Sequence, residues 1–300
     1  MKSNILLTGS SGFLGKEILK VIDNDKVHTL NRSNSTFNYD LSKNIPLFNV
    51  SFEYVIHCAG RAHSIPKTEN DKSDFFDTNV KGTMNLLEGL SKITIPKYFV
   101  YISSVSVYGL TEGKNINENH FLNANDAYGQ SKIQAEKQVI NWCKKNNVIC
   151  TILRLPLIVG QNPPGNLKSM ISGIRKGYYF NIAGGNAKKS MVLASDIAKF
   201  ILKAAVVGGT YNLTDGIHPT FNDLSKSISQ SLDKSFVPNM PLLIANVLAK
   251  IGDKLGNAFP LNSQKLYKIH STLTFDDSKA RKSFGWDPNP VLEWLLVNPQ

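Results

Sequence analysis

The sequence has 300 residues, of which 42% are hydrophobic and 19% charged, and this length suits one large soluble domain with a smaller appendage. No apolar run approaches the roughly 20 residues that span a bilayer, and no leader precedes Ile5, so we expect a cytoplasmic protein without stable membrane insertion. The net charge of +11 comes from scattered lysines without interleaved aromatic residues, which argues against nucleic-acid binding. Cys58, Cys143 and Cys150 lack metal-ligand spacing, so no metal site is expected.

A strand, a glycine-rich turn and a helix are predicted at the start of the chain. The strand covers residues 5–8, the turn reads GSSGFLG, and apolar residues at helical spacing follow through residue 22. Such a turn suits the pyrophosphate of a dinucleotide at the helix N-terminus. The residues expected to meet the cofactor here are Gly9, Ser11, Gly12, Phe13, Leu14 and Gly15.

Strands and helices alternate through the first half of the chain, which predicts a parallel, doubly wound α/β sheet. The predicted strands cover residues 5–8, 27–30, 54–58, 98–103 and 149–153, and the helices residues 12–22, 75–92 and 127–145. We expect a dinucleotide-binding core over residues 1–160 and a substrate lobe over 161–300, from which residues 190–215 return to the core.

The C-terminal lobe is predicted to be small and mostly helical over residues 221–273. One apolar run in it, PLLIANVLAKIG, fits either a membrane-surface helix or a helix packed in the core, and we expect core packing. Asp196 is expected to cap the helix that returns to the core.

Tyr128 and Lys132 lie four residues apart in the stretch YGQSK. On a helix they share a face, so we expect the ammonium of Lys132 to lower the pKa of the Tyr128 phenol. A phenolate stabilised in this way exchanges a proton with a sugar or alcohol hydroxyl while a nicotinamide takes or gives a hydride.

With GSSGFLG, SSVSVYG and YGQSK, and with FGWDPNP near its end, the chain resembles the extended short-chain dehydrogenases/reductases. This family contains nucleotide-sugar epimerases, dehydratases and 4-keto reductases. The resemblance implies a Rossmann-type fold and a homodimer formed through the tyrosine-bearing helix. It also implies that Ser104 holds the reacting sugar oxygen and that Lys132 holds the nicotinamide ribose. Dehydratases of the family carry Asp and Glu after this serine; Val105 and Ser106 stand there instead, so dehydration is not expected.

The residues after the second strand bear on the choice between NAD and NADP. Asn31 and Arg32 replace the acid that would bind the ribose 2′-hydroxyl of NAD, which favours NADP. Arginine also stacks on adenine in NAD-using relatives, or has no cofactor role, so both cofactors stay open. Further cofactor contacts implied by the resemblance are Asp40, Leu41, Cys58, Ala59, Gly60, Asn79, Tyr128, Lys132 and Leu155. Asp40 and Leu41 also fit a simple turn.

Expected substrate contacts are spread over four segments. Arg61 and His63 resemble a pair found in 4-epimerase-like and 4-keto-reductase members, although a solvated loop is an equal alternative. Lys189 stands where relatives carry an arginine against the substrate diphosphate, keeping the charge without the two-pronged geometry. The remaining expected contacts are Ser104, Ser106 and Asn166.

These observations predict an NAD(P)-dependent enzyme acting at C4 of a UDP- or dTDP-linked sugar. Arg32 favours reduction of a 4-keto sugar in surface-polysaccharide biosynthesis, and a 4-epimerase with tightly bound NAD is the alternative. A non-catalytic relative that binds NADP as a sensor is a further alternative, against which Ser104, Tyr128 and Lys132 argue.

Overall fold

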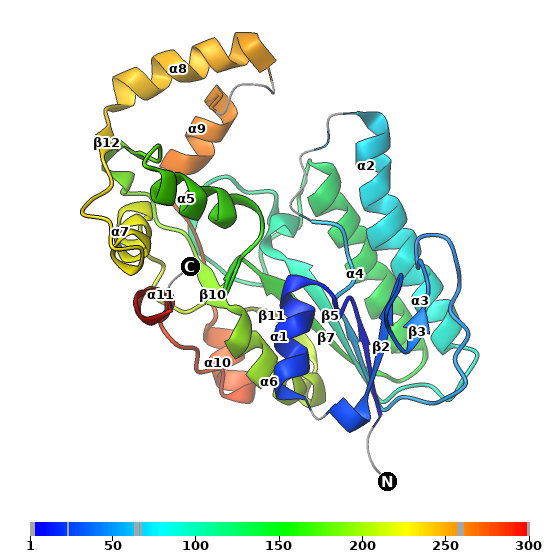
Figure 1. Ribbon diagram of the computed structural model, residues 1–300. Helices are drawn as coiled ribbons and strands as arrows, with labels where there is room; N and C mark the ends of the chain where they lie inside the picture. Colours follow the sequence, from blue (N-terminus) through cyan, green and yellow to red (C-terminus); the bar gives the residue numbers. More distant parts are fainter. Residues whose placement is uncertain (1–3, 23, 63–65, 67, 257–260, 299–300) are drawn as a thin grey trace.

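The computed structural model describes residues 4–22, 24–62, 66, 68–256 and 261–298. Its centre is a parallel sheet of seven strands in the order β11-β7-β5-β4-β1-β2-β3 (Figure 1). The strands are β1 (Ile5–Thr8), β2 (Val27–Asn31), β3 (Phe37–Asn38), β4 (Tyr54–His57), β5 (Tyr98–Ser104), β7 (Ile149–Leu155) and β11 (Gly209–Asn212). The parallel doubly wound sheet is confirmed. Five of the seven strands match predicted ones, β11 lies in the segment expected to return to the core, and the two-residue β3 is too short to leave a pattern.

Helices cover both faces of this sheet. On one face, α1 (Phe13–Val21) and α6 (Ala194–Val207) pack with the strands into one apolar cluster. On the other face, α3 (Gly82–Leu90) and α4 (Ala127–Lys145) form a second cluster. Because both faces are buried, the strands read as continuous apolar runs rather than alternating ones.

The helix predicted over residues 75–92 begins earlier and is interrupted. It starts at α2 (Glu69–Phe76) because Thr68 and Asp71 form a reciprocal capping box, with bonds of 3.1 and 3.0 Å. A π-helical turn, Asp77–Lys81, then joins α2 to α3. Such turns often occur at functional sites, and this one carries Asn79.

The C-terminal lobe is mostly helical, as predicted. Its core joins α5, α7, α11 and strand β10. Its elements, with the short strands that flank them, are β6 (Gly113–Ile116), β8 (Leu157–Val159), α5 (Gly165–Lys176), β9 (Asn181–Ile182), β10 (Met191–Leu193), α7 (Phe221–Ser231), β12 (Asn239–Met240), α8 (Leu242–Leu255), α9 (Ser263–His270), β13 (Leu273–Phe275), α10 (Ser278–Phe284) and α11 (Val291–Val297).

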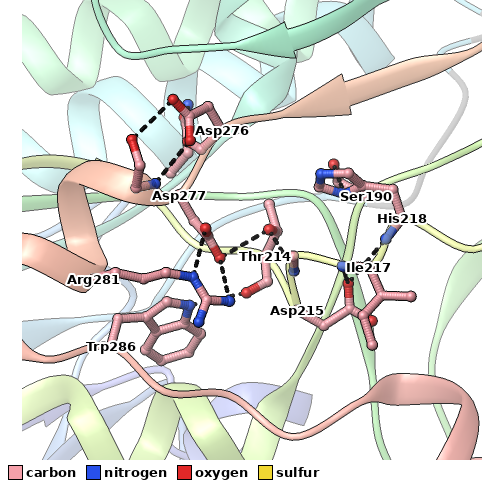
Figure 2. A network of polar contacts seen from close by, with 12 residues as sticks. Ser190, Thr214, Asp215, Ile217, His218, Asp276, Asp277, Arg281 and Trp286 are labelled. Atoms are coloured by element: carbon pink, nitrogen blue, oxygen red, sulfur yellow. Dashed lines mark hydrogen bonds and ion pairs between the residues drawn. The ribbon is translucent and has the colours of Figure 1, made fainter.

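Polar contacts tie the last part of the chain to the end of β11 (Figure 2). Thr214 donates to Asp277 at 3.1 Å, and Asp277 also accepts from Arg281 at 2.9 Å. Trp286 donates its indole N–H to the carbonyl of Thr214 at 2.9 Å. These bonds hold α10 and the following segment against the sheet, which places the lobe beside the carboxyl ends of the strands.

Two expectations for the second half of the chain are wrong. Asp196 does not cap α6; Leu193 is the cap residue, and the Asp196 carboxylate accepts two bonds from Asn289, at 2.7 and 2.8 Å. The apolar residues of α8 do not pack in the core, because its buried positions are the small residues Ala245, Ala249 and Gly252. The large side chains are left outside, Leu243 being 80% exposed. None of the described helices is long and apolar enough to cross a membrane.

Candidate active site

The glycine-rich turn after β1 is packed too tightly for side chains. Gly9 has a φ of +70°, and a Cβ on it would overlap the backbone of Ala59. A Cβ on Gly15 would overlap the carbonyl oxygen of Gly9 and Cα of Ser10. Gly12, the cap residue of α1, leaves the helix N-terminus open to the turn. This cradle fits a dinucleotide pyrophosphate, which needs close backbone approach and the positive end of a helix.

A cavity of about 730 Å³ opens beside this turn at the carboxyl ends of β1, β2 and β4. Ten of the residues expected to meet the cofactor line it: Gly9, Ser11, Gly12, Asn31, Arg32, Asp40, Leu41, Cys58, Ala59 and Gly60. Leu14 and Leu155 instead belong to the hydrophobic core. Lining residues that the sequence did not reveal, among them Tyr39, Lys43, Asp74 and Lys81, come from two segments that only the fold brings to this edge.

Charges of both signs share the rim of the cavity after β2. Asn31 joins the strand to the glycine-rich turn by donating to Ser10 at 2.7 Å. Hydrogen bonds from Ser42 hold the pKa of Asp40 below its usual value despite partial burial, and the nearby cations of Lys43 and Arg32 act in the same direction. Asp40 therefore stays an anion here, and it forms a turn while also lining the cavity.

Asn79 fixes the loop that follows β4. Its side chain accepts from the N–H of Arg61 at 2.7 Å and donates to the carbonyl of Arg61 at 3.1 Å and to Ser131 at 2.9 Å. The Arg61 guanidinium forms an ion pair with Asp74 at 2.9 Å and lies 5.6 Å above the ring of Phe75. Arg61, expected at the substrate, thus lines the cofactor cavity, and His63 lies outside the described residues.

Lys132 is buried beneath the end of β5. Its ammonium donates to the carbonyl of Ile102 at 2.8 Å and to the hydroxyl of Tyr101 at 3.2 Å. Burial lowers the pKa of Lys132 to about 8, against the raising effect of Glu136. Gly60 is close by, since a Cβ on it would lie 3.4 Å from the Lys132 nitrogen. Lys132 therefore connects the catalytic helix α4 to the wall of the cofactor cavity.

Tyr128 lies in the first turn of α4, which Asp126 caps by accepting from Gly129 at 3.0 Å. Burial raises the pKa of Tyr128 above its ordinary value, while a hydrogen bond with Ser104 lowers it in part. The expected lowering by Lys132 is therefore wrong for this arrangement. The Lys132 ammonium donates to the Ile102 carbonyl, and Ser104 rather than Lys132 is the neighbour that lowers the pKa of the Tyr128 phenol.

Ser104 ends β5 and accepts from the N–H of Ser106 at 3.2 Å. Its hydroxyl also donates to the Ser106 hydroxyl at 3.1 Å. Ser104, Tyr128 and Ser106 thus form one group of hydroxyls at the carboxyl end of β5. Positions 105 and 106 offer no carboxylate to serve as acid and base for dehydration.

A buried ion pair that was not predicted from the sequence lies next to this group of hydroxyls and is connected to it through Ser103. Glu136 and Arg154 are joined by bonds of 2.7 and 3.1 Å, and Ser103 donates to Glu136 at 2.5 Å. Arg154 also donates to the hydroxyl of Tyr108 at 3.1 Å. Because Glu136 follows Lys132 by four residues on α4, this helical spacing was the signal that could have identified it.

Two lysines in the C-terminal lobe, Lys189 and Lys268, are close enough for their charges to interact. Burial, and then the charge of Lys268 on α9, lower the pKa of Lys189 to about 8. Lys268 was not predicted, because about 80 residues separate the two and only the fold brings them together. Asn166 is exposed on the first turn of α5. Adjacent cations repel one another, which an anionic group placed between them would relieve.

The chain is similar to known proteins in both sequence and structure. The sequence profile of the NAD dependent epimerase/dehydratase family matches residues 5–213. The N-acetyl-alpha-D-glucosaminyl-diphospho-ditrans,octacis-undecaprenol 4-epimerase of Escherichia coli O157:H7 is 29% identical over 94% of this chain and 90% of its own. The UDP-glucose 4-epimerase of Vibrio cholerae is 26% identical over 98% and 93%. The structure of RMD from Pseudomonas aeruginosa complexed with NADPH has the same fold, with a TM-score of 0.73, 20% identity and coverage of 98% and 97%.

Proposed function

We propose that this chain, which belongs to the NAD-dependent epimerase/dehydratase family and uses NAD or NADP, inverts the configuration at C4 of a diphosphate-linked sugar. The group formed by Ser104 at the end of β5 and by Tyr128 and Lys132 on α4, without carboxylates at positions 105 and 106, carries this proposal. It provides proton transfer to one sugar oxygen and lacks the means to eliminate water. The two curated relatives that are 4-epimerases favour inversion, the alternative reading of the sequence, over reduction.

In the proposed inversion at C4, Ser104, Tyr128 and Lys132 each have a separate role. Ser104 hydrogen-bonds the C4 oxygen, and Tyr128 takes the C4 hydroxyl proton and later returns it. When bound, the cofactor supplies the hydride acceptor and donor for C4, together with a positive charge on its oxidised ring. Lys132 binds the nicotinamide ribose, since its ammonium lies close to Gly60 in the wall of the cofactor cavity. Asn79 and Gly60 keep the loop after β4 close to Lys132.

The diphosphate is the part of the substrate that the lobe recognises. Lys189 and Lys268 supply two neighbouring positive charges, of which the first is half-buried. One relative acts on a sugar joined through a diphosphate to undecaprenol, and the other on UDP-glucose. The diphosphate is common to both, so we propose that the lysines bind it whichever carrier is attached. Asn166, at the start of α5, is proposed to contact the same part of the substrate.

Reduction of a 4-keto sugar is the second candidate, and Arg32 is the observation that favours it. Its side chain lines the cofactor cavity, where the family's acidic residue is replaced. A guanidinium there pairs with the 2′-phosphate of NADP, the cofactor suited to net reduction.

The proposal is tested by offering the purified protein UDP-glucose, UDP-N-acetylglucosamine and polyprenyl-diphosphate N-acetylglucosamine, with NMR as the readout of C4 configuration. We expect inversion of at least one, and a loss of two or more orders of magnitude in Tyr128→Phe with cofactor binding retained. Mass and absorbance of ligand released on denaturation distinguish the candidates. Retained NAD supports the epimerase; a ligand-free protein that oxidises NADPH only with a 4-keto sugar supports the reductase.

A further inference from the structure

Helix α8 presents a stripe of large apolar side chains to solvent. Leu243, Val247, Ile251 and Leu255 recur every fourth residue and so share one face of the helix, with Ile244 beside them. Leu243 is 80% exposed and Val247 60% exposed. We call these five residues the α8 apolar face. Figure 1 shows α8 at the outer end of the lobe, away from the seven-stranded sheet.

The opposite face of α8 already has its packing partner. Ala245 and Ala249 are buried against Leu266 of α9, and Gly252 is buried on the same side. Small residues let the two helices approach closely, so this face accounts for the attachment of α8 to the protein. Each residue of the α8 apolar face keeps between 43% and 80% of its surface exposed in the described chain, and an exposed apolar surface of this kind indicates an external partner.

Positive charges accompany the α8 apolar face. Lys250 and Lys254 lie one helical turn apart, each three residues from a member of the stripe. The acid of α8, Asp253, accepts two bonds from Ser263, at 3.0 and 2.5 Å. Lys268 and the half-exposed ring of Tyr267 follow on α9. Apolar residues flanked by lysines, with an aromatic ring nearby, suit a surface that is apolar inside and anionic outside.

We propose that the α8 apolar face docks this protein on an anionic lipid bilayer, lying in the headgroup region rather than crossing it. A second copy of the chain fits less well, because pairing two such faces would bring their lysines together. Anionic headgroups instead neutralise Lys250 and Lys254 while the acyl chains cover the leucines. Of the two interpretations of PLLIANVLAKIG, the structure thus favours the membrane surface.

Docking in this orientation has a consequence for the substrate lobe. Helix α9 lies between α8 and the remainder of the lobe, and it carries Lys268, the neighbour of Lys189. Because α9 packs on the face of α8 opposite the apolar stripe, a bilayer on the stripe would lie across α8 from Lys268 and the proposed diphosphate site. The docking proposal goes beyond the proposed function and does not depend on it, since binding to lipid is measurable without turnover.

The test is flotation of the purified protein with vesicles of phosphatidylcholine containing phosphatidylglycerol, compared with pure phosphatidylcholine. The wild-type protein is expected to float with the anionic vesicles. The variant Leu243→Gln, Val247→Gln, Ile251→Gln is expected to bind on the order of tenfold less, with little change in melting temperature, because Leu243 and Val247 are 80% and 60% exposed. Lys250→Gln and Lys254→Gln are each expected to weaken binding about fivefold at low salt.

A matched control changes three apolar residues that are equally exposed elsewhere, Val21→Gln, Leu47→Gln and Phe121→Gln. This variant is expected to float like the wild type. Failure of the wild type to float, or equal flotation of the α8 variant, overturns the proposal. So does sedimentation of the wild type as a dimer that the α8 changes dissociate without any vesicle binding, which would assign the face to a second copy.

Discussion

Glu136 and Arg154 form a two-point ion pair inside the protein, with side chains only 2% and 7% exposed. The pair joins α4, which carries Tyr128 and Lys132, to β7. Ser103, the residue before Ser104 at the end of β5, also donates a hydrogen bond to Glu136. The catalytic group is thus positioned by charges that do not themselves contact the cavity.

Replacing Glu136 by Gln is expected to cost about 3–5 kcal/mol of unfolding free energy, because Arg154 is left as an uncompensated buried cation. Denaturant unfolding measures this change. Glu88→Gln is the control, since Glu88 pairs with Lys92 at the surface with both side chains about half exposed, and its cost should stay within about 0.5 kcal/mol. Equal costs for the two variants would show that the buried pair does not support the fold.

The lowered pKa of Lys132 predicts how stability changes with pH. The pKa is about 8 in the folded protein and 10.5 ordinarily, so between these values the unfolded chain binds more protons. The unfolding free energy of the wild type should therefore rise relative to Lys132→Met from pH 8 to 10.5, by on the order of 3 kcal/mol. Chemical denaturation of both proteins at several pH values measures the difference, and a difference that stays constant across this range would contradict the prediction.

Substitutions of two glycines in the first turn are expected to have different effects, one on stability and the other on cofactor affinity. In Gly15→Ala the new methyl group meets the backbone of Gly9 and Ser10, so stability should fall by about 1–3 kcal/mol. In Gly12→Ala the nearest atom is the Gly9 oxygen at 3.1 Å, and the position lines the cavity. This variant should keep most of its stability and lose cofactor affinity. Melting temperature and NADPH fluorescence titration distinguish the two, and identical behaviour would contradict the assigned roles.

Lys189 is expected to act on binding rather than on chemistry. Lys189→Gln removes one charge from the proposed diphosphate site, which should raise KM by about tenfold or more while kcat changes little. Lys189→Arg should restore most of the affinity. Steady-state kinetics on the accepted substrate measure this, with the exposed Lys168→Gln as control. A fall in kcat at unchanged KM would place Lys189 in the catalytic step instead.

Much of the fold was predictable because short apolar runs in the sequence coincide with the buried strands of the parallel sheet. The strands β1 and β4 are short and mainly apolar, each with one polar residue at its end, and Gly9 in the turn between β1 and α1 has a positive φ that favours glycine. The start of α2 was missed because the Thr68–Asp71 capping box outweighs the weakly apolar residues after it. The prediction that the large apolar residues of α8 pack in the core was wrong, because the alanines of this helix, rather than its leucines, pack against α9.

The electrostatics of the site could not be predicted from spacing. Lys132 and Tyr128 share a helical face, yet the direction of the ammonium is set by Ile102 on β5, some 30 residues earlier. Likewise, the charge of Lys268 acts on Lys189 only because the fold brings these two distant parts of the chain near each other. The resemblance predicted which residues are catalytic, whereas their pKa values depend on burial, which is a property of the whole fold.

The most direct test uses substrate deuterated at C4, with mass spectrometry and NMR of the product as the readout. For a C4 epimerase in which hydride leaves and returns within one site, the product should have inverted C4 and retain the deuterium, and Tyr128→Phe should form it at least about a hundredfold more slowly. Unchanged C4 configuration across all accepted substrates, or full activity in Tyr128→Phe, would contradict the account.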